Sequence, residues 1–364
     1  MIGIIGAGPT GLAIAYLLKK RGMEFQILER DSVGSMWKNQ YAALRLNSLR
    51  DVSSLPGMQM PKSYPTFPSA AQFESYLKEY AEKFKLPIQK AEVKELNLKG
   101  PDIEVMTDQG NLNYQAVIIA TGIWSAPYHP YANSAPFVGQ VLHSSEYRTA
   151  APFKGKRVLV VGSGASAGDI VVDLVGSAAA VGMSIAHGVN IVPPITSTTV
   201  FKIFKAIFES DKLFRLIHPL LVGMRVDHSS IGLPTHPESD SQRGYSVILG
   251  EALVNTVKAG QIQTHPAFSS FTERGAAFAD GRQADFDAII FATGYRPALD
   301  FARSCFDFDE VGYPLLNEFA STRSKNLYFV GPGRDYSHNI GWLAILERTA
   351  NRIVDRIDLP EMKQ

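Results

Sequence analysis

Residues 137–168 read FVGQVLHSSEYRTAAPFKGKRVLVVGSGASAG, and this stretch decides how the rest of the chain is interpreted. The apolar run Val158–Val161 predicts a buried strand that leads directly into the glycine-rich turn 162–164. Glycines at such a turn let the backbone approach a pyrophosphate, and the free N–H groups of the following helix favour bound phosphate. We expect that helix to begin near Ser166, so the stretch predicts a dinucleotide-binding turn.

A second stretch of the same kind lies at the amino terminus. Ile2, Ile4 and Ile5 predict a buried strand that ends at GAGPTG, residues 6–11. This is G-x-G-x-x-G in its strand–turn–helix setting. The next strand ends at Glu29, about 20 residues further on, where a carboxylate accepts hydrogen bonds from ribose hydroxyls and repels a 2′-phosphate. The first site therefore suits FAD better than NADP.

Two A-T-G sequences, at 120–122 and 292–294, flank the second turn, and each ends an apolar strand. Glycine allows a tight turn against a cofactor there, and threonine can hydrogen-bond backbone or ring edge. We expect an α/β fold with two Rossmann-like dinucleotide-binding domains (FAD and NAD(P)), the second inserted in the first. The expected bounds are 1–150 and 292–364 for the discontinuous FAD-binding domain, and 151–291 for the NAD(P)-binding domain, with a helical insertion at about 196–240.

Composition excludes several classes of protein. The chain of 364 residues is 45% hydrophobic and 20% charged, which is ordinary for two globular domains. Lys plus Arg number 36 against 35 acidic residues, so no overall field attracts nucleic acid. One cysteine, Cys305, fits a reducing compartment, and eight scattered histidines predict no metal site. The first residues have no basic region, so we expect no signal peptide and a cytoplasmic protein.

Phe137, Gly139, His143 and Tyr147 fit the spacing F-x-G-x-x-x-H-x-x-x-Y immediately before the second turn. This spacing resembles the fingerprint of the flavin-containing monooxygenases. In the related Baeyer–Villiger enzymes the last position is usually Trp followed by Pro or Asp, so the match favours oxygenation of a heteroatom. We expect His143 to be a structural residue in a loop that forms a spine between the two domains.

Tyr41, Leu44 and Asn47 match a second pattern of the same family, Y-x-x-L-x-x-N. The resemblance implies that Asn47 lies beside the isoalloxazine ring. Its neutral amide could donate to the distal oxygen of a flavin peroxide and hold the nicotinamide, which makes Asn47 the candidate catalytic residue. The alternative is an asparagine that caps a turn before Ser48.

The resemblance implies a class B flavoprotein monooxygenase. NAD(P)H reduces FAD, and molecular oxygen then forms a C4a-(hydro)peroxyflavin that oxygenates a soft nitrogen or sulfur centre of a small amine or sulfide. One alternative is Baeyer–Villiger or YUCCA-like oxygenation of a ketone or other carbonyl compound, because 232–234 and 253–281 resemble the plant YUCCA branch. Another is an NAD(P)H oxidase or a flavin-binding sensor. A thioredoxin-reductase type needs a Cys-x-x-Cys, which a single cysteine excludes.

The remaining site residues follow from the two turns and from the resemblance. The residues expected at FAD are Gly6, Gly8, Pro9, Gly11, Glu29, Trp37, Asn47, Thr121 and Thr293. The residues expected at NADPH or NADH are Gly162, Ser163, Gly164, Ser166, Ala167 and His187. His187 stands where NADPH-preferring members of the family usually have Arg. A neutral imidazole neither repels nor strongly binds a 2′-phosphate, so we expect relaxed use of the two nucleotides.

Apolar residues with interleaved lysines and arginines run through 200–222 at helical spacing. A basic amphipathic helix can lie on a membrane, but charges and Pro219 interrupt this run. We expect it to cover a substrate tunnel or to contact a second copy of the chain in a homodimer, with no membrane contact.

Periodicity predicts the other elements. The expected helices are 69–85 and a last helix from residue 339 or 340 to 353. The expected strands are 25–28, 88–98, 103–107, 112–114, 117–120, 183–186, 289–292 and 327–330.

Overall fold

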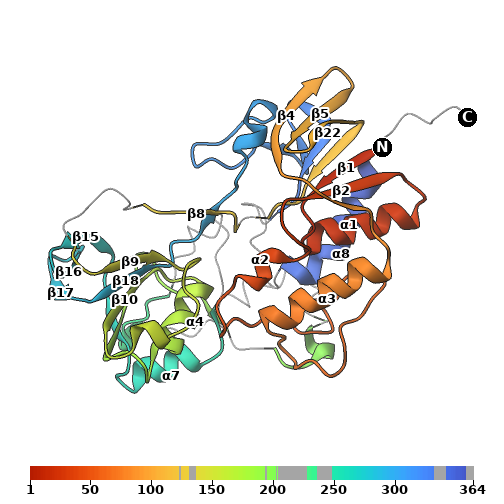
Figure 1. The fold of residues 1–364 in the computed structure, drawn as a ribbon. Coiled ribbons are helices and arrows are strands. Elements are labelled where there is room, and N and C mark those ends of the chain that lie inside the picture. The colour runs from red at the N-terminus through yellow and green to blue at the C-terminus, as the bar shows by residue number, and fades with distance from the viewer. Residues whose placement is uncertain are drawn as a thin grey trace, which may run out of the picture.

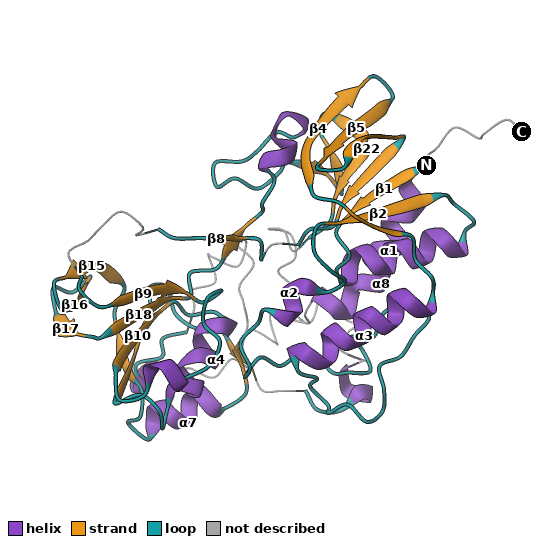
Figure 2. Cartoon of the chain, in the orientation of Figure 1, coloured by secondary structure: helices purple, strands orange, loops and turns teal. Residues whose placement is uncertain are grey.

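The computed structural model describes residues 1–122, 124–130, 137–192, 195–201, 203, 228–235, 248–331 and 342–357. Its two largest sheets are separate and mainly parallel, and each is covered by helices on one face (Figures 1 and 2). We call the larger sheet with its helices the first unit and the smaller one the second unit. The expected α/β fold with two Rossmann-like units is confirmed.

The first sheet draws its strands from both ends of the chain. Its order is β20-β21-β22-β7-β1-β2-β3, and β22, β7, β1, β2 and β3 run parallel. The strands are β1 (Ile2–Ile5), β2 (Phe25–Glu29), β3 (Ile88–Lys90), β7 (Ala116–Ile119), β20 (Leu316–Asn317), β21 (Ala320–Ser321) and β22 (Ser324–Phe329). Central β1 is buried along its whole length, which explains its unbroken apolar sequence.

Helices α1 (Pro9–Lys20), α3 (Ala70–Lys83) and α8 (Trp342–Arg356) cover one face of this sheet (Figure 2). A capping box begins α3, because the Ser69 hydroxyl accepts from the Gln72 N–H and the Gln72 side chain accepts from the Ser69 N–H. Its aromatic residues Phe73, Tyr76 and Tyr80 are fully buried core residues. The short helix α2 (Ser35–Lys38) follows β2.

An antiparallel meander covers the other face. It consists of β4 (Val93–Lys99), β5 (Asp102–Thr107) and β6 (Gly110–Tyr114), and the 3-10 helix Asp300–Cys305 packs on β4. Alternate residues of each central strand lie on opposite faces of the sheet. Ile118 packs against the helices, and Ile119 packs against the meander. The first unit therefore has three layers.

The second unit repeats this plan. Its parallel sheet has the order β14-β11-β10-β18-β9. The strands are β9 (Gln140–His143), β10 (Arg157–Val161), β11 (Ala180–Ser184), β14 (Gln263–His265) and β18 (Ala288–Phe291). Helices α4 (Ala165–Leu174) and α7 (Ala252–Lys258) pack on one face. A meander of β15 (Phe268–Thr272), β16 (Gly275–Phe278) and β17 (Gln283–Asp285) packs on the other.

Short pieces complete the described chain. They are the pair β12 (Ile191–Val192) and β13 (Ile248–Leu249), the connecting strands β8 (Ala126–Pro127) and β19 (Tyr295–Arg296), and the 3-10 helices Ala151–Phe153 and Ser229–Ile231.

The two connections between the units lie side by side. Strand β8 pairs antiparallel with β19, directly after the two A-T-G sequences (Figure 1). The Thr293 hydroxyl donates to the Tyr128 carbonyl oxygen at 2.5 Å, and the Arg296 guanidinium lies 3.9 Å from the Tyr128 ring centroid. The chain thus leaves the first unit and returns to it through one two-stranded ribbon.

Three predicted segments differ from the structure. The expected strand 88–98 is two strands, because after β3 the chain leaves the parallel sheet and begins the meander at β4. The expected strand 183–186 lies at Ala180–Ser184, so His187 falls in the loop beyond it. Strand β9 joins the second sheet, although the expected bound at residue 150 counted it with the first unit. The fingerprint spacing carries no signal of sheet membership. Most of 200–222 lies outside the described residues, as do 332–341.

Replacing Gly11 by alanine should destabilise the fold. The added Cβ would stand 2.0 Å from the Gly6 carbonyl oxygen, so helix α1 would have to move away from its strand. We expect the free energy of unfolding to fall by about 3 kcal/mol or more in chemical denaturation. Gly8→Ala is the matched control, since its Cβ has no described atom within 4 Å. Equal stability of the two variants would contradict this account of the turn.

Candidate active site

A cavity of about 750 Å³ opens at the carboxyl ends of β1, β2 and β7 and extends to the first turns of α4. Ligand sites in open α/β sheets lie at this edge of the sheet. The predicted residues in its wall are Gly6, Gly8, Pro9, Glu29, Trp37, Asn47, Thr121 and Ser166. Both units therefore contribute to one site.

The first turn is shaped for a nucleotide. Gly6 has a φ of +108°, which L side chains rarely adopt, and it turns the chain from β1 toward α1. Above Gly8, space is open where the Cβ of another residue would stand. Gly11 does not line the cavity; it lets α1 pack closely on Gly6. The turn therefore leaves room for a pyrophosphate at the start of the helix.

Glu29 ends β2 at the cavity wall. Its Oε2 accepts the Ala7 N–H at 2.8 Å, and its Oε1 accepts the Asp31 N–H at 3.0 Å. A carboxylate has about four acceptor positions, so it can also accept hydrogen bonds from ribose hydroxyls. Glu29 thus holds the turn in shape and is placed to bind an adenosine ribose.

Thr121 gives independent evidence for a polar ligand. Its Oγ1 is buried, lines the cavity and has no hydrogen-bond partner among the described residues. A buried hydroxyl without a partner is costly, and a bound ligand can supply the missing hydrogen bond. Trp37 adds an aromatic wall and packs edge-on against Trp124, with ring centroids 4.8 Å apart. These features fit FAD.

Asn47 lies on the cavity wall with its side chain exposed. In the described part of the chain its amide makes no hydrogen bond, and Ser48 bonds instead to the Ser53 hydroxyl at 2.6 Å. The turn-capping alternative is therefore not what the structure has. The amide remains available to a ligand in the cavity.

The second turn is reached by the cavity only in part. Ala165, Ser166 and Asp169 of α4 line it. The other predicted residues lie outside this wall: Gly162, Ser163, Gly164, Ala167, His187 and Thr293. Gly162 has a φ of +141°, and a Cβ there would stand 2.3 Å from the Ala292 carbonyl oxygen. The turn therefore has the conformation of a nucleotide site. The Thr293 hydroxyl is not free for a nucleotide, because it donates to the Tyr128 carbonyl oxygen.

Strand register shows which residue replaces Glu29 in the second unit. Leu28 pairs with Ile5, and Ser184 pairs with Val161 in the same relation. The residue after Ser184 is Ile185, which is buried. An apolar side chain therefore stands where the first unit has Glu29, and no carboxylate at this position would repel a 2′-phosphate.

The four fingerprint residues have structural contacts. The Phe137 ring stacks on Phe271 at 5.8 Å, and a Cβ on Gly139 would stand 2.7 Å from the Asp287 carbonyl oxygen. His143 Nε2 lies 3.1 Å from the Gly294 carbonyl oxygen, and Nδ1 lies 3.0 Å from the Ser145 hydroxyl.

His143 is fully buried, and burial lowers its pKa to about 4. It is therefore a neutral structural residue near pH 7. It lies at the end of strand β9 and not in a loop, and it ties this strand to the return connection through Gly294.

One pair of residues was not recognised from the sequence. The Tyr41 hydroxyl donates to Asp169 Oδ2 at 2.7 Å, across the boundary between the units. Burial is the main cause that raises the pKa of both groups. The sequence contained half of the signal, since Tyr41 belongs to the Y-x-x-L-x-x-N pattern. Its partner could be found only after the two units were brought together.

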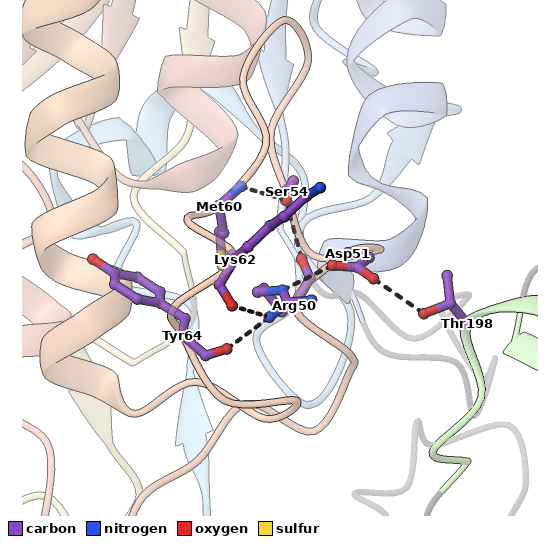
Figure 3. Close-up of polar contacts among 7 residues, drawn as sticks. All are labelled: Arg50, Asp51, Ser54, Met60, Lys62, Tyr64 and Thr198. Atoms are coloured by element: carbon purple, nitrogen blue, oxygen red, sulfur yellow. Dashed lines mark hydrogen bonds and ion pairs between the residues drawn. The ribbon is translucent and has the colours of Figure 1, made fainter.

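The chain after Asn47 is held by Arg50 (Figure 3). Its Nη1 donates to the carbonyl oxygens of Lys62 at 2.9 Å and Tyr64 at 2.7 Å, and its Nε donates to Asp51 Oδ1 at 2.8 Å. The Thr198 hydroxyl donates to Asp51 Oδ2 at 3.1 Å. The segment after β12 thus contacts the first unit beside the cavity loop.

Two other kinds of site are absent from the described ranges. No three His, Cys, Asp or Glu side chains gather there as metal ligands. No helix in that part of the chain has the length and apolar sequence needed to cross a bilayer.

Known proteins resemble this chain over most of its length. Residues 3–198 match the family described as pyridine nucleotide-disulphide oxidoreductase. The probable indole-3-pyruvate monooxygenase YUCCA1 of Arabidopsis thaliana is 33% identical over 316 residues, covering 80% of this chain and 75% of the relative. The flavin-containing monooxygenase of Stenotrophomonas maltophilia has a similar structure, with a TM-score of 0.74, 25% identity, and 97% and 98% of the two chains covered.

The fold and the site define a two-nucleotide flavoprotein. The chain belongs to the flavin-containing monooxygenase family. It is an oxidoreductase of the monooxygenase type, and its cofactors are FAD and a nicotinamide nucleotide.

His143 should make stability depend on pH. Its folded pKa of about 4 lies below its ordinary 6.5, so between these values the unfolded chain binds more protons. The free energy of unfolding should therefore fall as pH falls from 6.5 to 4, by up to about 3 kcal/mol from this residue. Denaturant titrations should show a weaker fall in His143→Gln. His265→Gln is the comparison variant, because burial also lowers the pKa of His265. An identical fall in wild type and His143→Gln would refute this role.

Proposed function

We propose that this enzyme forms a C4a-(hydro)peroxyflavin and transfers one oxygen atom to a small organic substrate. When bound, FAD accepts hydride from NAD(P)H and activates dioxygen. The observation that carries the proposal is the position of Asn47. Its amide has no hydrogen-bond partner among the described residues and lines the cavity that also presents Thr121 and the first turns of α4. An amide donor at this position stabilises negative charge on a reduced oxygen species.

The proposed division of the chain follows the two sheets. The FAD-binding domain comprises residues 1 to about 125 and about 296–364, and the NAD(P)-binding domain comprises the part between. Pairing of β8 with β19 supports these bounds, because both connections pass through that ribbon. In this arrangement α4 would hold the nicotinamide nucleotide through Gly162, Ser163, Gly164, Ser166 and Ala167.

The chain's own residues would also exclude water. Trp37, Trp124 and Trp342 line the cavity together with Tyr41 and Tyr295. Large aromatic side chains keep solvent from a reactive oxygen species, which water would otherwise release as hydrogen peroxide. This supports oxygen transfer over an oxidase reaction.

We propose a soft nitrogen or sulfur centre as the first candidate substrate class, on the strength of the flavin-containing monooxygenase pattern at Asn47. The second candidate is a carbonyl compound, such as a 2-oxo acid. The relatives named indole-3-pyruvate monooxygenase favour it, since they are 30–33% identical over 80–91% of this chain. Tyr147 does not decide between them, because its hydroxyl bonds to Asp173 and lies outside the cavity wall.

Rapid mixing of the reduced holoenzyme with oxygen tests the reaction. We expect an oxygenated flavin species that persists longer with bound NADP, and oxygenated product from a sulfide, a tertiary amine or a 2-oxo acid. Release of carbon dioxide from the 2-oxo acid would select the second substrate class. Immediate return to oxidised flavin, with hydrogen peroxide as the product from every substrate, would identify an oxidase instead.

Asn47→Ala should separate flavin binding from oxygenation. FAD content should stay at the wild-type level, while product formation falls by roughly 100-fold, because the amide donor to the developing charge is lost. Product and hydrogen peroxide are measured per NAD(P)H consumed. Asn113→Ala, which removes an exposed amide on β6, is the control. Unchanged coupling in Asn47→Ala would remove this residue from the mechanism.

Wild type should use NADPH and NADH with similar efficiency. The two side chains in question after β11, buried Ile185 and exposed His187, have no carboxylate that would repel a 2′-phosphate. His187→Arg should shift the ratio of kcat/KM values toward NADPH by about 10-fold through a charge-assisted contact with the 2′-phosphate. His187→Ala should leave the ratio near that of wild type. A wild-type NADPH preference above roughly 100-fold, about 2.7 kcal/mol, would refute relaxed use.

A further inference from the structure

The segment that carries Asn47 contacts the second unit at both ends. At its start, the Tyr41 hydroxyl donates to Asp169 Oδ2 at 2.7 Å. Near its end, Asp51 accepts a hydrogen bond from Thr198 at 3.1 Å. The second contact is exposed and therefore weak, whereas the first is part-buried and its tyrosine is buried. Of these two side-chain contacts, the one at Tyr41 therefore holds the Asn47 segment more strongly, beside the backbone bond from the Ala42 N–H to the Arg148 carbonyl oxygen.

Tyr41 belongs to the first unit by sequence and to the second by packing. Only 4% of it is exposed, and its ring lies in the core cluster built by α4, β10 and β18. The ring centroid is 6.3 Å from that of Tyr147. Burial keeps the hydroxyl protonated, so it remains a donor to the carboxylate. A hydrogen bond to a charged acceptor is stronger than a neutral one, and a half-buried carboxylate left without its donor is costly.

Asp169 connects this contact to the nucleotide turn. It lies in the early part of α4, one turn after the residues expected to bind phosphate, and its carboxylate lines the cavity. The hydrogen bond from the Tyr41 hydroxyl to Asp169 therefore joins the Asn47 segment to the nucleotide end of α4.

We infer that Tyr41 and Asp169 are positioning residues that fix Asn47 relative to the nicotinamide nucleotide on α4. Their hydrogen bond sets the register between the two units at the active site. Binding of the nucleotide at the start of α4 would then hold Asn47 in place more firmly. This inference rests on the proposed function only for its consequence in catalysis, because the contact itself can be tested without turnover.

The chain offers a matched control one helical turn away. The Tyr147 hydroxyl donates to Asp173 Oδ2 at 2.5 Å. Helix α4 thus has two aspartates at positions i and i+4, Asp169 and Asp173, and each accepts a hydrogen bond from a tyrosine. Tyr147 is as buried as Tyr41, but neither Tyr147 nor Asp173 lines the cavity. Tyr147→Phe therefore removes the same kind of hydrogen bond and keeps the ring that packs against Tyr41.

Hydrogen–deuterium exchange of the FAD-loaded protein, without substrate, tests the inference. The backbone N–H groups of Ala42, Leu44 and Leu46 bond to the carbonyl oxygens of Arg148, Tyr41 and Pro68, so their exchange reports on the segment. Tyr41→Phe should speed their exchange by about tenfold, the effect of one lost hydrogen bond. NADP should slow exchange in wild type and not in this variant. Tyr147→Phe should behave like wild type.

Turnover supplies the second readout. Tyr41→Phe should raise the fraction of NAD(P)H that ends as hydrogen peroxide, while Tyr147→Phe should not. Asp169→Asn, which keeps the shape of the acceptor, should give the same changes to a smaller extent and replaces Tyr41→Phe if that variant does not fold. Equal exchange at the three amides in Tyr41→Phe, Tyr147→Phe and wild type would overturn the inference. If the exchange pattern is as expected but the enzyme oxygenates no substrate, the proposed function is refuted. The inferred role of the Tyr41–Asp169 contact is then still supported.

Discussion

The close approach of a helix to the strand before it is the constraint on which this structure depends. At the first turn, α1 packs so tightly on Gly6 that only a glycine fits at position 11. The second turn has buried Ala167 in the equivalent place, and there α4 follows β10. Each turn directs the start of a helix toward the carboxyl edge of a parallel sheet, where a phosphate can be bound by free N–H groups. The cavity lies at this edge.

The two units repeat one plan, with helices on one face of a parallel sheet and an antiparallel meander on the other. The pairing of β8 with β19 holds both connections in one ribbon, so the units meet at a single boundary. Most polar side chains that the fold needs are satisfied internally: His143 and Thr293 bond to backbone carbonyls at the connections. Thr121 is different, because its buried hydroxyl lines the cavity without a partner in the described chain, and the exposed Asn47 lines the same cavity. A buried unsatisfied group in a cavity marks a place where a ligand can bind.

The electrostatics of the cavity boundary follow from burial. Tyr41 and Asp169 share a hydrogen bond where the two units meet, and burial favours the neutral tyrosine as donor. The carboxylate gains a donor that substitutes for water. An active site assembled from two units needs such contacts, because small errors in the relative position of reacting groups cost much of the rate. The contacts of Arg50 and Asp51 hold the following chain in the same way. They contribute less to stability, because they are more exposed.

The sequence by itself determined the class of fold, the two nucleotide turns and most strands, because glycine spacing and apolar runs are local signals. It also predicted Glu29, Asn47 and Thr121 from strand ends or from a family pattern, and all three line the cavity. Tertiary structure decided the rest. The membership of β9 in the second sheet, the division of 88–98 into two strands and the partnership of Tyr41 with Asp169 depend on pairing between distant residues. Period and spacing describe one segment at a time, whereas these contacts exist only after the units pack together, which is why no local pattern contains them.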